Sequence, residues 1–310
     1  MAVARFLPTR SGTKKILMTS PSAPLLRLLP AIFIFIWSSG FIVAKFGLPY
    51  AEPLTFLCMR YLGVVLFMGF LALSMRAQWP VRSAWLSIAI AGVMMQAGYL
   101  GAVWCAIKIG MPAGLVALIV SMQPILTTIF GPLIGERTNS KQWLGLGLGI
   151  LGVAFVLANK ISLTGVSGVS GVSISLSIFS LLSITMGTLY QKKYCPSFDV
   201  RTGQVIQFFA SLLVTLPFAL VLENHHILWT AQFVGAMAWS IFVMSGLGIS
   251  VLTIMIRHGE ASKVTGYMYL VPAVTAMMAW FMFDEIITMS TIFGMLIAIT
   301  GVALVVKSKP

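Results

Sequence analysis

Uncharged polar and aromatic side chains in the middle of long apolar stretches are the residues through which this chain can best bind a small molecule. In apolar surroundings such groups are costly to bury unless they hydrogen-bond to a partner. Gln96 and Tyr99 are three positions apart and would share one face of a helix. Together, such residues indicate a moderately apolar pocket with hydroxyl and amide groups and almost no charge, which suits a neutral or zwitterionic metabolite. The predicted substrate-binding residues are Trp37, Ser38, Gln96, Tyr99, Ser121, Ser183, Ser245 and Tyr269.

For each of these residues taken singly, a structural role is an alternative interpretation. A serine or glutamine can pack between helices, and an aromatic residue can lie in the belt at the membrane surface.

Arg60 is the one charged side chain well inside an apolar stretch. At 1.5 Å per residue it would lie about 10 Å below the end of its helix. A charge at a helix centre costs about 2.5–3.5 kcal/mol on insertion scales, so its presence needs a reason. Arg60 could attract a substrate carboxylate, or it could bind helix-end carbonyls or Glu52 and so hold the helices together. We predict the structural role.

Proline and glycine residues mark further structural or gating positions. Pro124 and Pro272 each fall in mid-stretch, where a proline removes a backbone hydrogen bond and bends a helix. Such a bend beside a cavity serves as a gating hinge or as a static kink. Gly145, Gly149 and Gly152 form a stripe of small residues on one face, which predicts close helix packing.

Catalytic, metal-binding and nucleotide-binding motifs are absent from the sequence. It contains no H-E-x-x-H, G-x-S-x-G or Walker motif, and its three cysteines have no metal-ligand spacing. We therefore expect no enzyme activity, no cofactor, no metal ion and no ATP-driven step. The seven acidic residues all fall in predicted loops or helix ends, which argues against obligatory proton exchange through a buried carboxylate.

The elements that position these residues follow from the composition. Hydrophobic residues make up 59% of the chain and charged residues only 9%, whereas a soluble domain carries about 25% charge. The fold class is therefore all-α integral membrane, with the lipid bilayer as solvent. The net charge of +13 does not indicate nucleic-acid binding, because the basic residues are spread singly rather than gathered in one patch.

Apolar stretches long enough for a spanning helix of about 20 residues occur throughout the chain. The predicted spans are 28–47, 53–74, 83–107, 112–134, 142–158, 172–191, 202–222, 230–256, 261–283 and 289–306. Counting along these spans puts sixteen basic residues on one side of the membrane and three on the other. Under the positive-inside rule both termini are cytoplasmic, in a membrane of the bacterial inner-membrane type.

An internal repeat appears when the chain is shifted by about 147 residues. The pattern E-x8-G-x6-G begins at Glu136 and again at Glu285. Each half holds five predicted spans, so the second half enters the membrane upside down, as in secondary transporters with a central binding site. The predicted organisation is a tail at 1–27, a first repeat at 28–160, a linker at 161–171 and an inverted second repeat at 172–310.

These patterns resemble the EamA type of the drug/metabolite transporter superfamily. The opening of the family is matched by Trp37 to Phe41, Lys45, Pro53 and Arg60, and the end of each repeat by a proline followed by E-x8-G-x6-G. The resemblance implies ten transmembrane helices around a central cavity, and among family members the chain is most similar to the YddG-type aromatic amino acid exporters. Ser38-Ser39 and Gln207 depart from the family pattern and leave the substrate class open.

The resulting expectation is a secondary transporter that exports small amphipathic metabolites, amino acids and aromatic ones included, by alternating access. A multidrug exporter of lipophilic compounds is the alternative within transport, and a channel or membrane scaffold is the alternative outside it. A small-molecule substrate and the bilayer are the expected partners. The oligomeric state stays open, with a monomer as one possibility.

Overall fold

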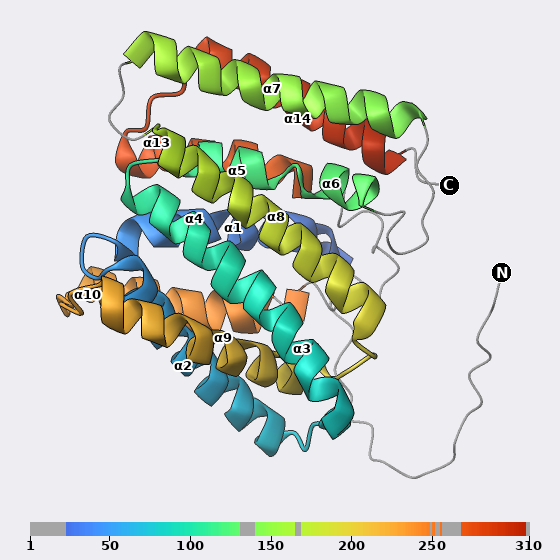
Figure 1. Ribbon diagram of the computed structural model, residues 1–310, viewed down its shortest axis with the longest axis vertical. Coiled ribbons are helices and arrows are strands. Elements are labelled where there is room, and N and C mark those ends of the chain that lie inside the picture. The colour runs from blue at the N-terminus through green and yellow to red at the C-terminus, as the bar shows by residue number, and fades with distance from the viewer. Residues whose placement is uncertain are drawn as a thin grey trace.

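The structure is a computed structural model that describes residues 23–130, 140–164, 169–248, 250–251, 255 and 268–307. Within these ranges the regular structure is entirely helical (Figure 1). This agrees with the predicted all-α class. Glu136, which begins the first E-x8-G-x6-G segment, lies outside the described residues.

The first half of the chain begins with two long helices and continues with helices that are interrupted. Residues 82–108 form one continuous helical rod whose middle is a π-helix, η2. The elements of this half are α1 (Ala23–Gly47), α2 (Pro53–Ser74), η1 (Arg82–Ala84), α3 (Trp85–Gly92), η2 (Val93–Gly98), α4 (Tyr99–Lys108), α5 (Ala113–Val120), α6 (Gln123–Ile129) and α7 (Ser140–Thr164).

The second half has a similar order of elements. It also contains a π-helix, η4, which directly follows α10. The elements of this half are α8 (Gly171–Tyr194), α9 (Val200–Leu222), α10 (Ala231–Ala238), η4 (Trp239–Gly248), η5 (Met268–Leu270), α13 (Val271–Phe283) and α14 (Met289–Lys307).

Six helices are long and apolar enough to cross a membrane, judged by length and composition alone. They are Leu28–Gly47, Pro53–Ser74, Arg82–Lys108, Gly171–Tyr194, Val200–Leu222 and Ala231–Gly248. Shorter apolar helices occupy Ala113–Thr127, Trp143–Val156, Val271–Phe283 and Met289–Leu304. Each predicted span overlaps one of these helices, and the chain is a multi-pass membrane protein.

Helices from the two halves pack against one another throughout the molecule. In Figure 1, α7 and α14 lie together along one edge, and α2 and α9 lie together at the opposite end. Between these pairs, α1 packs against α13 and η4, while α8 packs against α4 and α5. The core is therefore built between the halves rather than inside each half.

The stripe of small residues lies where α7 meets α14. A Cβ atom on Gly152 would come within 2.6 Å of the Ala298 nitrogen and the Gly294 oxygen. A Cβ atom on Gly301 would come within 2.6 Å of the Gly149 nitrogen. These contacts are with backbone atoms, so only glycine allows the two helices to approach this closely, as the sequence pattern predicted.

Pro124 and Pro272 begin helices rather than bend them. Pro124 is the second residue of α6, after a turn at Ser121 and Met122 that ends α5. Pro272 is the second residue of α13 and follows the short 3-10 turn η5. A proline in the first helical turn loses no hydrogen bond, because its N–H would have had no partner there. At Pro124 the predicted mid-helix bend is thus a break between α5 and α6, whereas the residues just before η5 lie outside the described part of the chain. A gating role for either proline stays a prediction.

Both ends of the predicted linker 161–171 are helical. Helix α7 continues to Thr164, and α8 begins at Gly171. Ser170 starts α8 because its side chain accepts a hydrogen bond from the Ser173 nitrogen while Ser173 bonds back to the Ser170 nitrogen, which forms a capping box. Residues 165–168 lie outside the described part of the chain.

Candidate substrate site

The two π-helices occupy equivalent places in the two halves. A shift of about 147 residues moves Val93–Gly98 onto positions 240–245, inside Trp239–Gly248. A π-helix closes its hydrogen bonds between residues five apart, which widens the turn and leaves backbone carbonyls without their usual partners. Such segments are rare and concentrate at functional sites.

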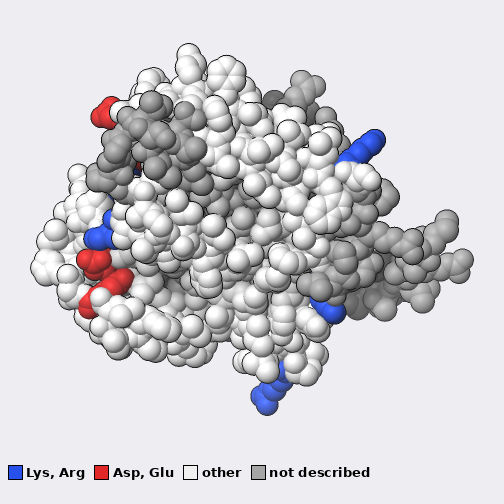
Figure 2. All heavy atoms as spheres, turned by 45° about the horizontal axis from the view of Figure 1, so that its top comes forward, with Lys and Arg blue, Asp and Glu red and all other residues white. Residues whose placement is uncertain are grey.

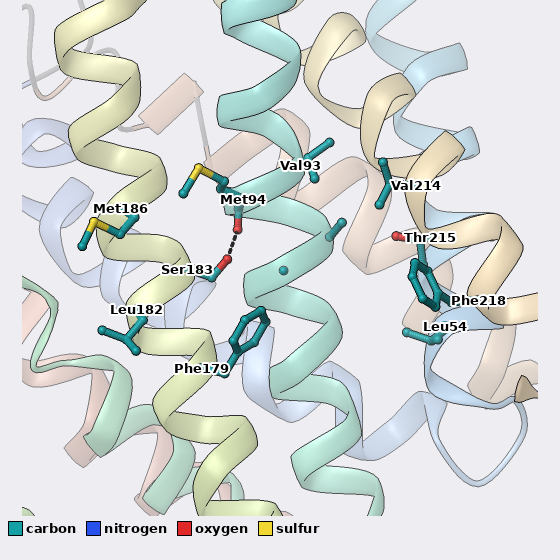
Figure 3. Close-up of a pocket in the computed structure, with 12 residues that line it drawn as sticks. Leu54, Val93, Met94, Phe179, Leu182, Ser183, Met186, Val214, Thr215 and Phe218 are labelled. Carbon is teal, nitrogen blue, oxygen red and sulfur yellow. Dashed lines mark hydrogen bonds between the residues drawn. The ribbon is translucent and has the colours of Figure 1, made fainter.

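Side chains from neighbouring helices donate hydrogen bonds to two backbone carbonyls of η2 that also accept from the Tyr99 nitrogen. The Ser183 hydroxyl on α8 donates a hydrogen bond to the Met94 carbonyl oxygen at 2.8 Å (Figure 3). From the opposite side, the Tyr61 hydroxyl on α2 donates to the Gln96 carbonyl oxygen at 2.9 Å. The π-helix is therefore held by one helix from each half.

Gln96 and Tyr99 lie at the end of η2 and the start of α4, and both are partly buried. The hydrogen bond recorded for Gln96 uses its backbone carbonyl. The prediction that the two side chains share a face assumed α-helical spacing, and the wider π-turn changes the rotation between them. Their role in binding substrate stays a prediction.

Trp37 and Ser38 lie in the middle of α1. The Trp37 ring is partly buried against Phe33, with ring centroids 5.1 Å apart. Ser38 is fully buried, and its hydroxyl donates to the Val271 carbonyl oxygen at 3.3 Å. Thr275 donates in turn to the Ser38 carbonyl oxygen at 3.4 Å. Ser38 thus links α1 to α13 across the two halves.

The other predicted serines bond within their own segments. Ser121 donates to the Leu118 carbonyl oxygen at 2.6 Å, at the break between α5 and α6. Ser245 is buried in η4 and donates to the Ser240 carbonyl oxygen at 3.3 Å. Tyr269 belongs to η5, and its side chain lies outside the described residues. The predicted set is therefore distributed over several helices, and most of its hydroxyl groups already have partners.

Two amide pairs inside the helix bundle were missed by the sequence analysis. Gln123 on α6 donates to the Thr188 hydroxyl on α8 at 3.0 Å. Gln207 on α9 donates to the Gln191 side-chain oxygen on α8 at 2.8 Å. Amides within apolar stretches were the available signal, but of the residues in these two contacts only Gln207 was noticed, as a departure from the family pattern.

An apolar groove of about 610 Å³ lies beside η2 (Figure 3). Ser183 is the one predicted site residue that lines it. Phe179 and Phe218, on its two walls, are 54% and 56% exposed, so the groove opens to the outside of the bundle. A second apolar cavity of about 410 Å³ lies between α1, α10 and α13, and the start of η4 at Trp239 lines it.

Arg60 lies on the inner face of α2 and is only 5% exposed. Its guanidinium forms no hydrogen bond or ion pair with any residue that the structure describes, and its buried Nε atom has no partner. The Glu52 carboxylate, which the sequence offered as a partner, lies 3.4 Å from Lys108 instead. The pairing between Arg60 and Glu52 is therefore not formed.

Charged groups gather at the helix ends. Figure 2 shows a mostly uncharged surface with acidic side chains on one side of the visible face. At the end of α1, Lys45 pairs with Glu285 at 2.6 Å, and the same Glu285 oxygen accepts a hydrogen bond from the Ala113 nitrogen. Glu223 accepts hydrogen bonds from the backbone nitrogens at the start of α2, at 2.7 Å each.

At the opposite end of the bundle, Asp199 caps α9. Its carboxylate accepts hydrogen bonds from the Arg201 backbone nitrogen and from the Arg201 guanidinium. The Arg201 side chain is the main cause that lowers the pKa of Asp199 below its usual value. Among the described residues, no cluster of three or more histidine, cysteine or acidic side chains could hold a metal ion.

Comparisons with known proteins give several similar transporters. The chain is 30% identical over 287 residues to the uncharacterized transporter YvbV of Bacillus subtilis (strain 168), which covers 91% of this chain and 92% of YvbV. It is 26% identical to a "probable amino-acid metabolite efflux pump" of Escherichia coli (strain K12), over 88% of this chain and 92% of that protein. It is 25% identical to the uncharacterized inner membrane transporter YedA of the same strain, over 82% and 81%.

The fold and the family agree with these similarities. One protein crystal structure, 12% identical, matches 91% of this chain and 96% of its own with a TM-score of 0.59, which shows a shared fold. The model of the EamA-like transporter family matches the chain twice, over residues 26–158 and 171–307. Since these matches cover most of the sequence, the protein belongs to the EamA-like transporter family.

Proposed function

We propose that this protein exports small amphipathic metabolites, amino acids and aromatic amino acids among them, across a bacterial-type inner membrane. The observation that carries the proposal is the double match to the EamA-like transporter family along nearly the whole chain. The similarity to a probable amino-acid metabolite efflux pump supports export and this substrate class. The proposal requires no metal ion, cofactor or ATP.

The proposed mechanism is alternating access between two inverted repeats of five transmembrane helices. The contacts between halves support it because they are reciprocal. The first helix of the first half packs on the third and fourth helical stretches of the second half, and α8 packs on the corresponding stretches, α4 and α5, of the first half. Two similar halves that exchange conformations turn an outward opening into an inward one.

The proposed orientation places both termini in the cytoplasm. The excess of basic residues on one side supports this orientation. A cysteine introduced at His226, in the loop after α9, should then react with a membrane-impermeant maleimide added outside intact cells, and one at Gln78, between α2 and η1, should not. The reverse labelling pattern would refute the proposed orientation, and the proposed transport function would remain.

Transport is proposed to run without obligatory proton exchange. The described acidic side chains support this view, because all five lie in loops or at helix ends. Glu52, Glu223, Glu285 and Asp199 each have a hydrogen-bond or ion-pair partner, and Asp284 is exposed at the end of α13. The substrate's own gradient is then the driving force. Uptake at equal pH on both sides of the membrane is the expected result.

The test of the proposed function is uptake into proteoliposomes with a panel of amino acids, nucleosides and lipophilic dyes. An exporter of amino acids should take up at least one amino acid, and preloading with unlabelled substrate should accelerate entry of the labelled one. A channel shows no such counterflow. The apolar groove beside η2 favours a second candidate, a multidrug exporter, which would transport the dyes and none of the amino acids.

A further inference from the structure

Arg60 is a buried cation without a counter-charge. Its side chain lies in the interior of a membrane protein with 5% of its surface exposed, and it has no hydrogen-bond or ion-pair partner among the residues in the described ranges. A buried charge is strongly unfavourable unless another charge or a set of hydrogen bonds compensates it. Arg60 therefore indicates a binding partner that the described part of the chain does not supply.

Four of the five acidic residues in the described structure bind other groups, and the fifth, Asp284, is exposed at the end of α13. Glu52 pairs with Lys108, Glu285 pairs with Lys45, and Asp199 pairs with Arg201. Glu223 binds the backbone nitrogens at the start of α2, about one helical turn or more from Arg60. The ionisable groups close enough to interact with the guanidinium are the phenols of Tyr61 and Tyr99.

The surroundings of Arg60 are aromatic and rich in donors. One turn earlier on α2, Phe56 packs on Trp104 of α4, with ring centroids 4.4 Å apart. The Trp104 indole nitrogen is a second buried donor without a partner in the described structure. The packed helices α2 and α4 thus each carry a buried N–H group that lacks a hydrogen-bond acceptor in the described structure. The Tyr61 hydroxyl beside Arg60 donates its own hydrogen bond to the Gln96 carbonyl.

We infer that Arg60 binds the carboxylate of the transported substrate, and that this protein therefore selects carboxylate-bearing solutes over their neutral or amine counterparts. A guanidinium offers a planar fork of N–H groups that matches the two oxygens of a carboxylate. The neighbouring Tyr99 and Trp104 rings would border the apolar part of such a molecule. The inference rests on the proposed transport of small metabolites and names the group by which the site recognises them.

The first test compares matched ligands on the unmodified protein. Thermal stabilisation in detergent is measured with L-phenylalanine, L-leucine and L-threonine, with their primary amides, and with 3-phenylpropionate. We expect at least one amino acid to bind about ten- to a hundred-fold more tightly than its amide, the range for losing a charge-assisted hydrogen bond. Equal binding of acid and amide would overturn the carboxylate inference and leave amino-acid transport standing. Binding of none of these ligands would overturn the proposed substrate class.

The second test uses variants of Arg60. Arg60→Met removes the charge and Arg60→Lys keeps the charge but removes the planar fork. Arg82→Met, an exposed arginine in η1, is the matched control for loss of one positive charge. Arg60→Met should lose the preference for acid over amide, Arg60→Lys should retain part of it, and Arg82→Met should keep it. A wild-type preference in folded Arg60→Met would overturn the inference, and the ligand comparison decides alone if that variant does not fold.

Discussion

At the scale of single residues, Ser183 and Tyr61 show how a membrane protein maintains an irregular helix. Each donates a hydrogen bond to a backbone carbonyl oxygen of η2 that also accepts one from the Tyr99 nitrogen. In lipid no water is available for the second acceptor position of such a carbonyl, so the side chains supply that bond. Gly98 allows the approach, because a Cβ atom there would collide with the Ser183 hydroxyl.

Replacing Ser183 with alanine should destabilise the protein by about 0.5–1.5 kcal/mol, because the Met94 carbonyl would lose one of its two hydrogen bonds and keep the one from the Tyr99 nitrogen. The measurement is the thermal unfolding midpoint in detergent. Ser250→Ala is the matched control, since the Ser250 hydroxyl bonds within its own helix at an exposed position. Equal midpoints for both variants would mean that the bond to η2 contributes nothing.

Substitution of Gln96 and Tyr99 tests their predicted place in the substrate site. Losing a buried hydrogen-bond partner costs about 1–3 kcal/mol, so Gln96→Leu should weaken substrate binding by about five- to a hundred-fold. Tyr99→Ala should have a similar effect, and Tyr99→Phe a smaller one if the ring matters more than the hydroxyl. Counterflow in proteoliposomes, normalised to folded protein, gives the answer. Wild-type affinity in Gln96→Leu and Tyr99→Ala would assign both residues to packing.

The sequence allowed the types of site residues to be predicted better than their partners. Ser183 was identified from its position in an apolar stretch, yet its partner is a backbone carbonyl of the π-helix η2, which the sequence does not reveal. The periodicity used to place Gln96 beside Tyr99 assumes a regular helix, and η2 is not one. The isolation of Arg60 could not be predicted either, because it depends on Glu52 pairing with Lys108.

At the scale of helices, backbone contact decides which positions tolerate a side chain. Gly152→Ala should destabilise the protein by about 1–3 kcal/mol, because its Cβ atom would lie 2.6 Å from backbone atoms of α14 that cannot move aside singly. Gly147→Ala on the same helix has nothing within 4 Å and should be neutral or slightly stabilising. Thermal unfolding of the two variants provides the comparison, and a Gly152→Ala midpoint as high as that of Gly147→Ala would contradict it.

The cap of α9 gives a pH-dependent prediction. The Arg201 side chain lowers the pKa of Asp199 in the folded protein, so the stabilisation is present above the ordinary pKa of 3.8 and is lost as the pH falls below it. Asp199→Ala should cost about 0.5–2 kcal/mol at neutral pH, mainly through loss of the N-cap. Asp199→Asn keeps a capping oxygen and should cost less.

Unfolding midpoints at neutral pH and at pH values below 3.8 test this difference. The difference in unfolding midpoint between Asp199→Ala and the unmodified protein should become smaller in acid. A difference in midpoint of the same size at both pH values would show that the ionised carboxylate does not contribute to the stabilisation.

The sequence predicted the close packing of helices that depends on small residues. It did not predict where helices end and restart near a proline. The glycine stripe correctly indicated close packing and is now seen between α7 and α14. The break before Pro124 was expected as a bend, since a sequence shows that a proline interrupts a helix but not whether a new helix starts there. Pro272 likewise lies in the first turn of α13, which directly follows η5.

At the scale of the whole molecule, the prediction of a multi-pass membrane protein depended mainly on the composition and the internal repeat. The shortage of charged residues indicated a membrane protein, and each predicted span overlaps an apolar helix. The grouping of helices across the halves could not be derived from the spans alone, because it depends on side-chain fit between distant segments. It places Lys45 of the first half beside Glu285 of the second half.

This ion pair connects the halves at the side predicted to face outward, and an alternating-access cycle must break and remake it. Lys45→Glu would place two carboxylates together there, and Glu285→Lys would place two ammonium groups together. A partly exposed pair contributes about 1 kcal/mol, which corresponds to about a fivefold change in the balance between closed and open states. Each single variant should therefore transport several-fold more slowly, while the double variant Lys45→Glu/Glu285→Lys should recover most of the rate.

The rate of counterflow in proteoliposomes, at equal amounts of folded protein, measures this recovery. Lys108→Glu with Glu52→Lys provides a matched exchange of an ion pair that stays within the first half. Its single variants should change the rate less, because that pair does not join surfaces that separate. If the double variant at Lys45 and Glu285 transports no faster than its single variants, the pair does not control closure. The Ala113 nitrogen, which also binds Glu285, would then be the contact that matters at this position.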